Sequence, residues 1–335
     1  MVIFLPIKLR STGGTSSFAQ KLQTGLQKLG HTVIFSYETN YDILLASPTA
    51  PWKFLFDAKK RGKPIVQRLD GVYYPTTTAS WLYPLYNTPL FIIHHFFTDY
   101  TIYQSKFSLY CCNKFLGKTS RPHTIIYNGV DTDFFSNIGN TKQLRATPNQ
   151  NVFITASRFR RLDQINPVIA AFKTYLKKYN PNSKLVVVGN FTRSTKNIPS
   201  KYRGEKNIDF VGIVENKQLP AYLRAADVFV FTHLNPPCPN NVVEALSCGL
   251  PIAGIGDGAM PELVSSGHEA ELIRINSNAF YKRRAYNLEE LAKNMHRIIN
   301  GLPTYKSAAR NKAISDFALN KMSTRYLKVF ESLLE

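Results

Sequence analysis

Apolar residues form short runs separated by longer stretches in which they recur every three or four positions, and this alternation occurs twice along the chain. Short apolar runs bounded by turn residues predict buried β-strands, whereas the longer spacing predicts amphipathic helices. The first series of predicted strands comprises residues 2–5, 31–35, 42–46, 64–69, 101–104 and 124–128. The second series comprises residues 151–157, 184–189, 208–212, 228–232, 251–255 and 271–275.

The segments between these strands have helical periodicity. The first predicted helix has one apolar face of Phe18, Leu22, Leu26 and Leu29, and the chain after Tyr305 is predicted to be helical to its end. Strands that alternate with helices are typical of a parallel sheet covered on both faces. The sequence therefore predicts an α/β protein with two Rossmann-like, doubly wound domains that bind ligands in the cleft between them, at the carboxyl ends of the strands.

Domain boundaries follow from a polar stretch near the middle of the chain. Residues 136–150 have no apolar period and are predicted to be the linker. We expect an N-terminal domain at residues 1–147, a C-terminal domain at residues 148–305 and a final helical segment at residues 306–335. The 335 residues, 44% of them apolar, are sufficient for two cores of ordinary size.

The charge is strongly positive and evenly spread. The chain has 42 basic and 22 acidic residues, of which residues 1–150 hold 16 and 7. Such a field attracts nucleotide sugars, anionic lipid surfaces or nucleic acid. The one compact cluster, Lys59-Lys60-Arg61-Gly62-Lys63, lacks the interleaved aromatic residues that stack on bases, which argues against nucleic acid. The cluster is either a solvated helix end or a contact with an anionic membrane.

Neither the termini nor the cysteines indicate export or metal binding. The first ten residues do not form a signal peptide, and the chain has no run of about 18 apolar residues. We expect a cytoplasmic protein, with peripheral contact at the cytoplasmic membrane face left open. The four cysteines have neither zinc-like nor disulfide-like spacing, and no Asp-x-Asp occurs. No metal and no cofactor are therefore expected.

Residues 233–262 are the most informative segment. They predict a loop, a short helix that Asn240 or Asn241 caps and Gly249 ends, a strand, and the glycine loop Gly256-Asp257-Gly258. Exposed backbone donors at a helix start suit an anion, and Glu244 near that start can reach a sugar hydroxyl. This combination suits a nucleoside diphosphate sugar. The alternative is a capping box in which Glu244 pairs with Asn241 and has no further role.

This segment resembles the donor-site motif of family 4 glycosyltransferases, the glycosyl transferases group 1, which have the GT-B fold. In that family the last helix crosses back to pack on the first domain, as expected here for residues 306–335. The resemblance extends from Gly13 to about Gly267. It implies that Glu244 is the second acid of an E-x7-E motif and holds the donor ribose. The first acid is replaced by Pro236, so either Asn235 or His233 would have to hold the donor sugar, or the sugar is held differently. It also implies a donor site that includes the residues Asn235, Asn240, Asn241 and Val242.

Two segments of the first half carry further candidates. The glycines in Ser11-Thr12-Gly13-Gly14 allow close approach of a phosphate, or they form a tight turn with a serine cap. In the resembled family a Gly-Gly loop at this position faces the donor diphosphate. Gln67-Arg68-Leu69-Asp70-Gly71 ends a strand and resembles the Arg-x-Asp-Gly signature of one branch of the family. Asp70 is the candidate for positioning the reacting sugars, and a turn-forming Asp-Gly is the alternative.

The end of the first domain resembles the family signature Asn-Gly-Val-Asp-x-x-x-Phe, here Asn128 to Asp131. We interpret it as structural. Asn128 and Gly129 would adopt the left-handed conformation that a bend needs, and Phe134 or Phe135 would anchor the hinge. The aromatic residues Tyr73, Tyr74, Trp81 and Tyr83 either stack on a sugar ring or pack the first domain, and most of them are expected to pack.

The second half supplies the expected phosphate ligands. Arg158 matches the family's arginine, and Arg160 or Arg161 would replace its lysine, because guanidinium groups bind phosphate in a bidentate manner. A solvated basic loop is the alternative. The resemblance also implies that Gly212 and the backbone around Val214 read the base, and that Gly258 and Glu262 line the donor pocket. Glu262 as a helix cap remains open.

The resemblance thus implies a retaining hexosyltransferase (EC 2.4) that moves a hexose from a UDP or GDP sugar to a hydroxyl of a glycan or lipid-linked saccharide. The residues indicate that it is metal-independent. Asp70 and Glu244 are its expected catalytic residues, and closure of the cleft would exclude water. The alternative is a catalytically silent GT-B protein that binds nucleotide or an anionic surface. Nucleic acid is not an expected partner.

Overall fold

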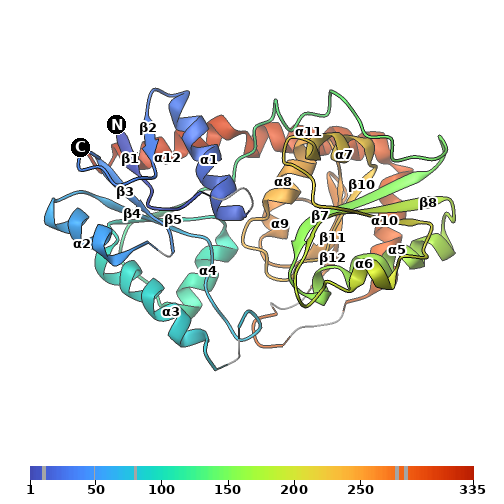
Figure 1. Cartoon of the computed structure of the whole chain (residues 1–335), viewed down its shortest axis with the longest axis horizontal. Coiled ribbons are helices and arrows are strands. Elements are labelled where there is room, and N and C mark those ends of the chain that lie inside the picture. The colour runs from blue at the N-terminus through green and yellow to red at the C-terminus, as the bar shows by residue number, and fades with distance from the viewer. Residues whose placement is uncertain (10–12, 49, 79–80, 276–278, 283–285) are drawn as a thin grey trace. The chain divides into compact units, whose positions relative to one another are not determined.

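A computed structural model describes residues 1–9, 13–48, 50–78, 81–275, 279–282 and 286–335 (Figure 1). The chain divides into two compact units. The first unit comprises Met1–Asp131, Ala279–Arg283 and Phe317–Glu335, and the second comprises Thr132–Asn278 and Arg284–Asp316. Residues 132–147 therefore belong to the second unit, and the segment 306–335 is shared between the units.

The first unit is built on a six-stranded sheet of order β2-β1-β3-β4-β5-β6. All its pairings are parallel, as the alternation of strands and helices predicted. In the register of its central pair, Val66 lies opposite Tyr100 and Leu69 opposite Tyr103. The strands are β1 (Val2–Phe4), β2 (Thr32–Ile34), β3 (Ile43–Ala46), β4 (Ile65–Leu69), β5 (Tyr100–Tyr103) and β6 (His123–Ile125).

Helices cover both faces of this sheet. They are α1 (Gly14–Gln27), α2 (Trp52–Lys60), α3 (Tyr83–Ile92), the π-turn η1 (Ile93–Phe97), α4 (Lys106–Phe115) and α12 (Leu319–Glu331). The apolar face of α1 packs with α12 in one buried cluster, where Phe18 lies 5.6 Å from Tyr326 between ring centroids. Leu29 was predicted to extend this face, but it follows the helix and is exposed.

The Asn128–Gly129 step differs from the prediction. Neither residue has a positive φ, so the expected left-handed bend is wrong. Gly129 is instead required by close packing, since a Cβ there would lie 3.0 Å from the Met322 Cβ and 3.2 Å from the Leu319 Cα. Val130 also bridges to Ala318. This segment therefore docks the start of α12. Of the two candidate anchors that follow, Phe135 is buried and Phe134 is exposed.

A short segment from the second half of the chain completes the first unit. Phe280 lies among Tyr74, Phe107 and Phe115 at centroid distances of 5.0 to 5.9 Å. The Thr76 N–H donates to the Phe280 carbonyl oxygen (3.0 Å), and the Thr76 hydroxyl donates to the Ala279 carbonyl oxygen (2.6 Å). The long sequence separation explains why local periodicity gave no sign of this contact.

The second unit has a six-stranded parallel sheet of order β12-β11-β10-β7-β8-β9. Its strands are β7 (Asn151–Phe159), β8 (Ser183–Phe191), β9 (Ile208–Gly212), β10 (Val228–Phe231), β11 (Ile252–Gly256) and β12 (Ala270–Arg274). Its helical elements are η2 (Leu162–Gln164), α5 (Asn166–Lys178), α6 (Ile198–Lys201), α7 (Leu219–Ala225), α8 (Asn240–Ser247), α9 (Met260–Leu263), α10 (Leu288–Asn300) and α11 (Leu302–Phe317).

The predicted linker contains no helix or strand. Backbone carbonyls of this region are bound by arginines of the second unit. Arg224 donates to the carbonyl oxygens of Ser136 (3.1 Å) and Asn140 (2.8 Å), and Arg310 donates to Thr132 (3.0 Å) and Phe135 (3.1 Å). In the described part of the chain, no helix has the length and apolar character needed to cross a membrane.

Candidate functional site

The strand order of the second unit defines where a ligand would bind. From β7, the chain first adds β8 and β9 on one side and then β10, β11 and β12 on the other. The loops after β7 and β10 therefore diverge to opposite sides at one point of the sheet, which is where ligands bind in open α/β sheets. Most of the predicted donor residues follow these two strands.

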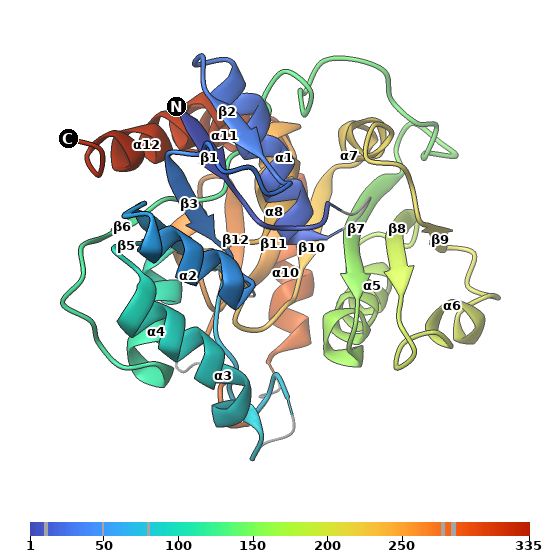
Figure 2. The ribbon, with the colours of Figure 1, turned by 60° about the vertical axis from the view of Figure 1, so that its left-hand side comes forward.

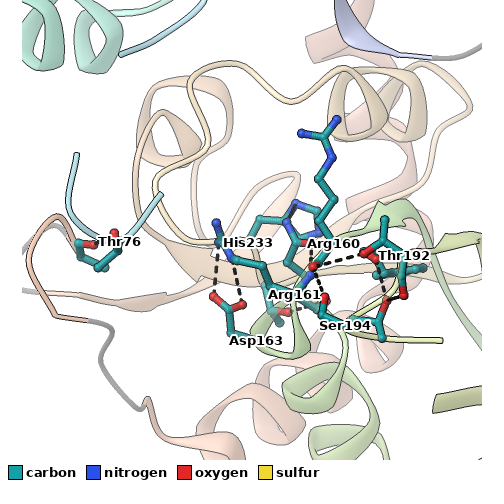
Figure 3. Close-up of polar contacts among 12 residues, drawn as sticks. Thr76, Arg160, Arg161, Asp163, Thr192, Ser194 and His233 are labelled. Carbon is teal, nitrogen blue, oxygen red and sulfur yellow. Dashed lines mark hydrogen bonds and ion pairs between the residues drawn. The ribbon is translucent and has the colours of Figure 1, made fainter. Parts of the chain in front are cut away.

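The loop after β7 is organised around Gln164, a residue for which the sequence predicted no role. The Gln164 side-chain oxygen accepts from the backbone N–H groups of Arg160 (2.7 Å) and Arg161 (3.2 Å). Hydroxyls from the loop after β8 bind the same turn: Thr192 (3.3 Å) and Ser194 (2.5 Å) both donate to the Arg160 carbonyl oxygen (Figure 3). The spacing from Arg161 to Gln164 is that of a helix capping box, and this spacing was the only sequence signal for the role of Gln164.

The three candidate arginines differ in their surroundings. Arg158 is exposed near the end of β7. Arg161 pairs with Asp163 through two contacts of 3.0 and 3.2 Å, whereas the Arg160 side chain extends away from this pair (Figure 3). Within the described residues the Arg160 guanidinium has no hydrogen-bond or ionic partner. Arg158 and Arg160 are therefore better placed to receive an anion than Arg161.

The loop after β10 carries His233, whose ring packs against the Phe231 ring in a tilted arrangement at 4.6 Å between centroids. Burial, together with the nearby Arg161 charge, lowers the pKa of His233 to about 4, although Asp163 acts in the opposite direction. The ring is therefore neutral near pH 7. A neutral imidazole can both donate and accept a hydrogen bond. The Gln164 amide lies 3.5 Å from its Nδ1, and the Thr232 hydroxyl donates to the Gln164 carbonyl oxygen at 3.3 Å.

Pro236, where the resembled motif has an acid, is buried in a junction with the glycine loop after β11. The Ala259 N–H donates to the Pro236 carbonyl oxygen (2.8 Å), and the Asn235 N–H donates to the Asp257 carboxylate (2.7 Å). A Cβ on Gly258 would lie 2.4 Å from the Pro236 Cδ, and Gly258 has a φ of +60°. The two loops thus fit together only with glycine at this position.

Asn235 and Asp257 are both constrained in this junction. Asn235 has a φ of +51°, which is uncommon for a residue other than glycine. Burial raises the pKa of Asp257 above its ordinary value, although backbone N–H donors from Asn235 and Gly258 act against this. Because Asp257 already receives these donors, its role is to position the loop that includes Asn235.

Helix α8 begins at Asn240, so Asn240 and Asn241 both lie inside the helix and neither is its N-cap. Its N-cap is Pro239, and no side chain caps it, so the prediction that Asn240 or Asn241 caps the helix is wrong. Asn241 instead donates to the Ala156 carbonyl oxygen on β7 (2.8 Å). The Asn240 side-chain oxygen is buried without a hydrogen-bond partner in the described structure. The helix start therefore has polar groups available for a ligand.

Glu244 is buried in the second turn of α8, between the buried residues Val243 and Ala245. This position is too far along the helix for the capping box with Asn241, so that alternative is excluded. Val242 is also buried, and its backbone N–H lies 3.1 Å from the side-chain oxygen of Asn241.

The remaining candidates of the second unit lie at other strand ends. Gly212 ends β9 with a φ of +79°, and Val214 follows it in a partly exposed turn. Glu262 lies inside α9, where its backbone N–H donates to the Ala259 carbonyl oxygen (2.9 Å). The structure does not assign either segment to a base or a sugar.

The first unit holds the other candidates. Gly13 has a φ of +121° and is the N-cap of α1 without a side-chain hydrogen bond, so the serine-cap alternative does not apply to the described residues. Ser11 and Thr12 lie outside those residues. Asp70 forms an ion pair with Arg68, which also donates to the Asn128 side chain (3.0 Å) and lies 3.6 Å from the Phe18 ring. The Asp70 carboxylate is therefore held at the end of β4.

The described residues include no group of three or more His, Cys, Asp or Glu arranged to hold a metal ion. The four cysteines are buried and free. His94 is buried, and its Nδ1 lies 2.9 Å from the Gln67 side-chain oxygen.

Comparison with solved structures identifies the fold class. HepE of Anabaena, solved in complex with UDP and glucose, matches with a TM-score of 0.75 and 16% identity over 99% of both chains. Sucrose-phosphate synthase from Thermosynechococcus elongatus matches with a TM-score of 0.79 and 14% identity over 99% of this chain and 98% of that chain. The protein therefore has the Rossmann-like GT-B fold.

A sequence family model identifies the family. The model of glycosyl transferases group 1 matches residues 139–308, which is more than half of the chain. The chain belongs to this family. Alpha-monoglucosyldiacylglycerol synthase of Acholeplasma laidlawii is 27% identical over 57% of this chain and 48% of that protein. N-acetyl-alpha-D-glucosaminyl L-malate synthase of Bacillus anthracis is 21% identical over 65% of this chain and 56% of that protein. The chain thus matches about half the length of these relatives.

Proposed function

We propose that the protein is a retaining glycosyltransferase that moves a hexose from a UDP or GDP sugar to a hydroxyl of a glycan or lipid-linked saccharide. Family membership supports the reaction class, and the relative named alpha-monoglucosyldiacylglycerol synthase supports an acceptor of lipid character. The observation that carries the donor assignment is the start of α8. There a helix without a side-chain cap, an unpartnered buried Asn240 oxygen and the buried Glu244 carboxylate occur within five residues.

In this proposal the second unit holds the nucleotide. Glu244 accepts hydrogen bonds from the ribose hydroxyls. Arg158 and Arg160 bind the diphosphate and neutralise the charge that develops as it leaves, so no metal ion is required. The N–H groups at the start of α8 add to the same field. Backbone groups near Gly212 and Val214 contact the base, and the loops at Gly258 and Glu262 border the sugar.

The donor sugar needs a partner other than the acid that Pro236 replaces. We propose that His233 or Asn235 takes this role. His233 is neutral and has a donor and an acceptor nitrogen, as recognition of a sugar hydroxyl requires. Asp70, held by Arg68, positions the reacting sugars, and Gly13 and Gly14 allow close approach of the diphosphate.

The first test is release of nucleoside diphosphate from a panel of UDP, GDP and ADP sugars, with a mixture of glycan and lipid-linked acceptors. We expect release from one donor and a loss of at least about a hundredfold in Glu244→Ala, since a buried carboxylate that binds two hydroxyls contributes several kcal/mol. Glu205→Ala, an exposed change on the same unit, is the matched control and should retain activity.

The replacement at Pro236 favours one alternative, a protein of this fold that binds nucleotide without transferring sugar. That alternative predicts a rise in melting temperature with a nucleotide but no release from any donor. Equal release by wild type and Glu244→Ala would overturn the assigned role of Glu244.

A further inference from the structure

Helix α3 and the π-turn η1 form a surface without formal charge. Residues 71–98 contain no Asp, Glu, Lys or Arg. A helix on the surface of a soluble protein normally directs charged residues toward water. In α3 only Asn87 and Leu90 are buried, so its outer side consists of apolar and neutral side chains.

Helix α2 continues this surface. Trp52 and Phe56 contact the Phe97 ring of η1 at centroid distances of 5.9 and 5.1 Å. Figure 2 shows α2, α3 and α4 on the same side of the first unit. Leu85 is 67% exposed, Phe96 is 65% exposed and Phe56 is 61% exposed. We call the following exposed residues the apolar face: Trp52, Phe56, Trp81, Leu85, Phe91 and Phe96.

The apolar face is more than the scattered exposure found on any protein. Single exposed apolar residues are ordinary, but a group on adjoining helices marks a surface that contacts another phase or molecule. Trp81, one of four aromatic residues of which most were expected to pack, is 77% exposed. Tryptophan and tyrosine favour the boundary between water and lipid, because their rings are apolar and carry one polar group.

Basic residues lie beside this face. The hydrogen bond between His95 Nε2 and the Leu116 carbonyl oxygen (2.9 Å) joins η1 to the end of α4, where the exposed Lys118 and Arg121 follow. At the other side, Lys59 pairs with Asp99 directly after η1 (2.6 Å), and Lys60 is exposed next to it. We call Lys59, Lys60, Lys118 and Arg121 the basic rim.

The charge around the face is positive. Residues 52–121 contain ten basic and three acidic residues. Each acid is paired with a basic residue of the same segment, Asp57 with Arg61, Asp70 with Arg68 and Asp99 with Lys59. The segment therefore carries a net charge of +7.

We propose that the apolar face and the basic rim dock the protein onto an anionic lipid bilayer. The apolar side chains enter the boundary between headgroups and acyl chains, and the basic rim binds the lipid phosphates. A second copy of the chain is a poorer occupant, because two faces of equal positive charge would repel each other. The ten residues of α3 extend only about 15 Å, so the helix lies in the membrane plane and does not cross it.

This inference concerns a surface of the first unit and does not depend on the proposed reaction. Its test is sedimentation of the full chain with vesicles, without any nucleotide sugar. Phosphatidylcholine vesicles are compared with vesicles in which roughly one third of the lipid is phosphatidylglycerol. We expect binding to the anionic vesicles only, and a fall in binding as salt increases.

Two double variants separate the contributions. Leu85→Ser with Phe96→Ser should weaken binding at least about tenfold, because two exposed apolar side chains lose their burial in lipid. Lys60→Glu with Lys118→Glu should weaken it at least about 25-fold, since each of the two charges near an anionic surface contributes about fivefold. The matched controls, Ile138→Ser with Ile213→Ser and Lys177→Glu with Lys293→Glu, change exposed residues of the second unit and should bind like wild type.

Melting curves verify that each variant is folded. Equal binding of wild type to neutral and anionic vesicles would overturn the proposal. Binding of both double variants at the wild-type level would also overturn it. The apolar face would instead be assigned to a second copy by two results together. Wild type would form a dimer in solution and bind no vesicles, and Leu85→Ser with Phe96→Ser would convert the dimer to monomers. If wild type binds anionic vesicles but releases no nucleoside diphosphate from any donor, the result counts against the proposed reaction and not against the docking surface.

Discussion

The two units share a six-stranded parallel sheet, yet their strand orders and their surfaces differ. In the second unit the chain starts at an inner strand, β7, and extends outward on both sides, so the loops after β7 and β10 diverge at the switch point. In the first unit the reversal lies between β1 and β3, near one edge. The same layered plan therefore presents different ligand positions.

The polar contacts of the two units differ accordingly. In the second unit, Gln164 holds the turn after β7, and Asp257 holds the loop after β10. In the first unit, one ion pair between Arg68 and Asp70 fixes the candidate side chain, while a large apolar face lies on α2, α3 and η1. Hydrogen-bonded loops therefore preorganise the proposed donor side of the second unit, whereas the first unit carries the proposed surface contact.

The largest loss of stability is expected from a substitution that disrupts the loop junction of the second unit. Gly258→Ala places a methyl group about 2.4 Å from Pro236 and at a positive φ, so we expect the free energy of unfolding to fall by about 3 kcal/mol or more. Gly267→Ala is the matched control, because Gly267 also has a positive φ (+84°) but no atom within 4 Å of the added Cβ. Urea unfolding measures both. Equal losses would show that crowding at Pro236 is unimportant.

Two histidines, one in each unit, should make the free energy of unfolding depend on pH. Burial lowers the pKa of His94 to about 4, with His95 and His123 adding to the effect. Between about pH 6.5 and 4 the unfolded chain binds a proton that folded His94 does not, so stability falls as the pH falls through this range. The loss should reach about 3 kcal/mol at pH 4 and be absent above pH 7.

His94→Asn should therefore flatten the dependence of stability on pH, and His268→Asn, at an exposed position, should not. Because the pKa of His233 is also lowered to about 4, His233→Asn should flatten it in the same range. Thermal unfolding at several pH values measures all three variants. An unchanged pH dependence in His94→Asn would contradict the neutral, buried assignment.

The smallest expected effect separates two neighbouring arginines. Arg160→Ala should weaken donor binding about tenfold, because its guanidinium is available for the diphosphate. Arg161→Ala should weaken it by no more than about threefold, since Arg161 is already paired with Asp163. Arg203→Ala, an exposed change on the same unit, is the control. Calorimetric titration with nucleoside diphosphate measures the three affinities, and a larger loss in Arg161→Ala would reverse the assignment.

Much of the fold was predictable because parallel strands are buried on both faces and form short apolar runs. Runs such as residues 184–189 and 228–232 correspond to β8 and β10, and the α1 face of Phe18, Leu22 and Leu26 is buried. Family membership was predictable from the residues around Glu244, since that motif is local in sequence.

Features that depend on distant contacts were not predictable. Gly129 was expected to provide a bend, but its role is to admit Met322 from the last helix. Asn241 was expected to cap α8, but it binds the Ala156 carbonyl oxygen on another strand. Most aromatic residues between Val72 and Tyr86 were expected to pack, but Trp81 is exposed, because hydrophobicity alone does not distinguish a core from an exposed apolar surface.

The central claim is that the second unit binds the donor nucleotide and that the first unit contributes to transfer. Calorimetric titration of the preferred nucleoside diphosphate into wild type, Glu244→Ala and Asp70→Asn, with transfer assayed in parallel, tests it most directly. We expect Glu244→Ala to lose at least about tenfold in affinity. We also expect Asp70→Asn to bind nucleotide like wild type but to transfer sugar much more slowly. Wild-type affinity in Glu244→Ala, or loss of nucleotide binding in a folded Asp70→Asn, would contradict the claim.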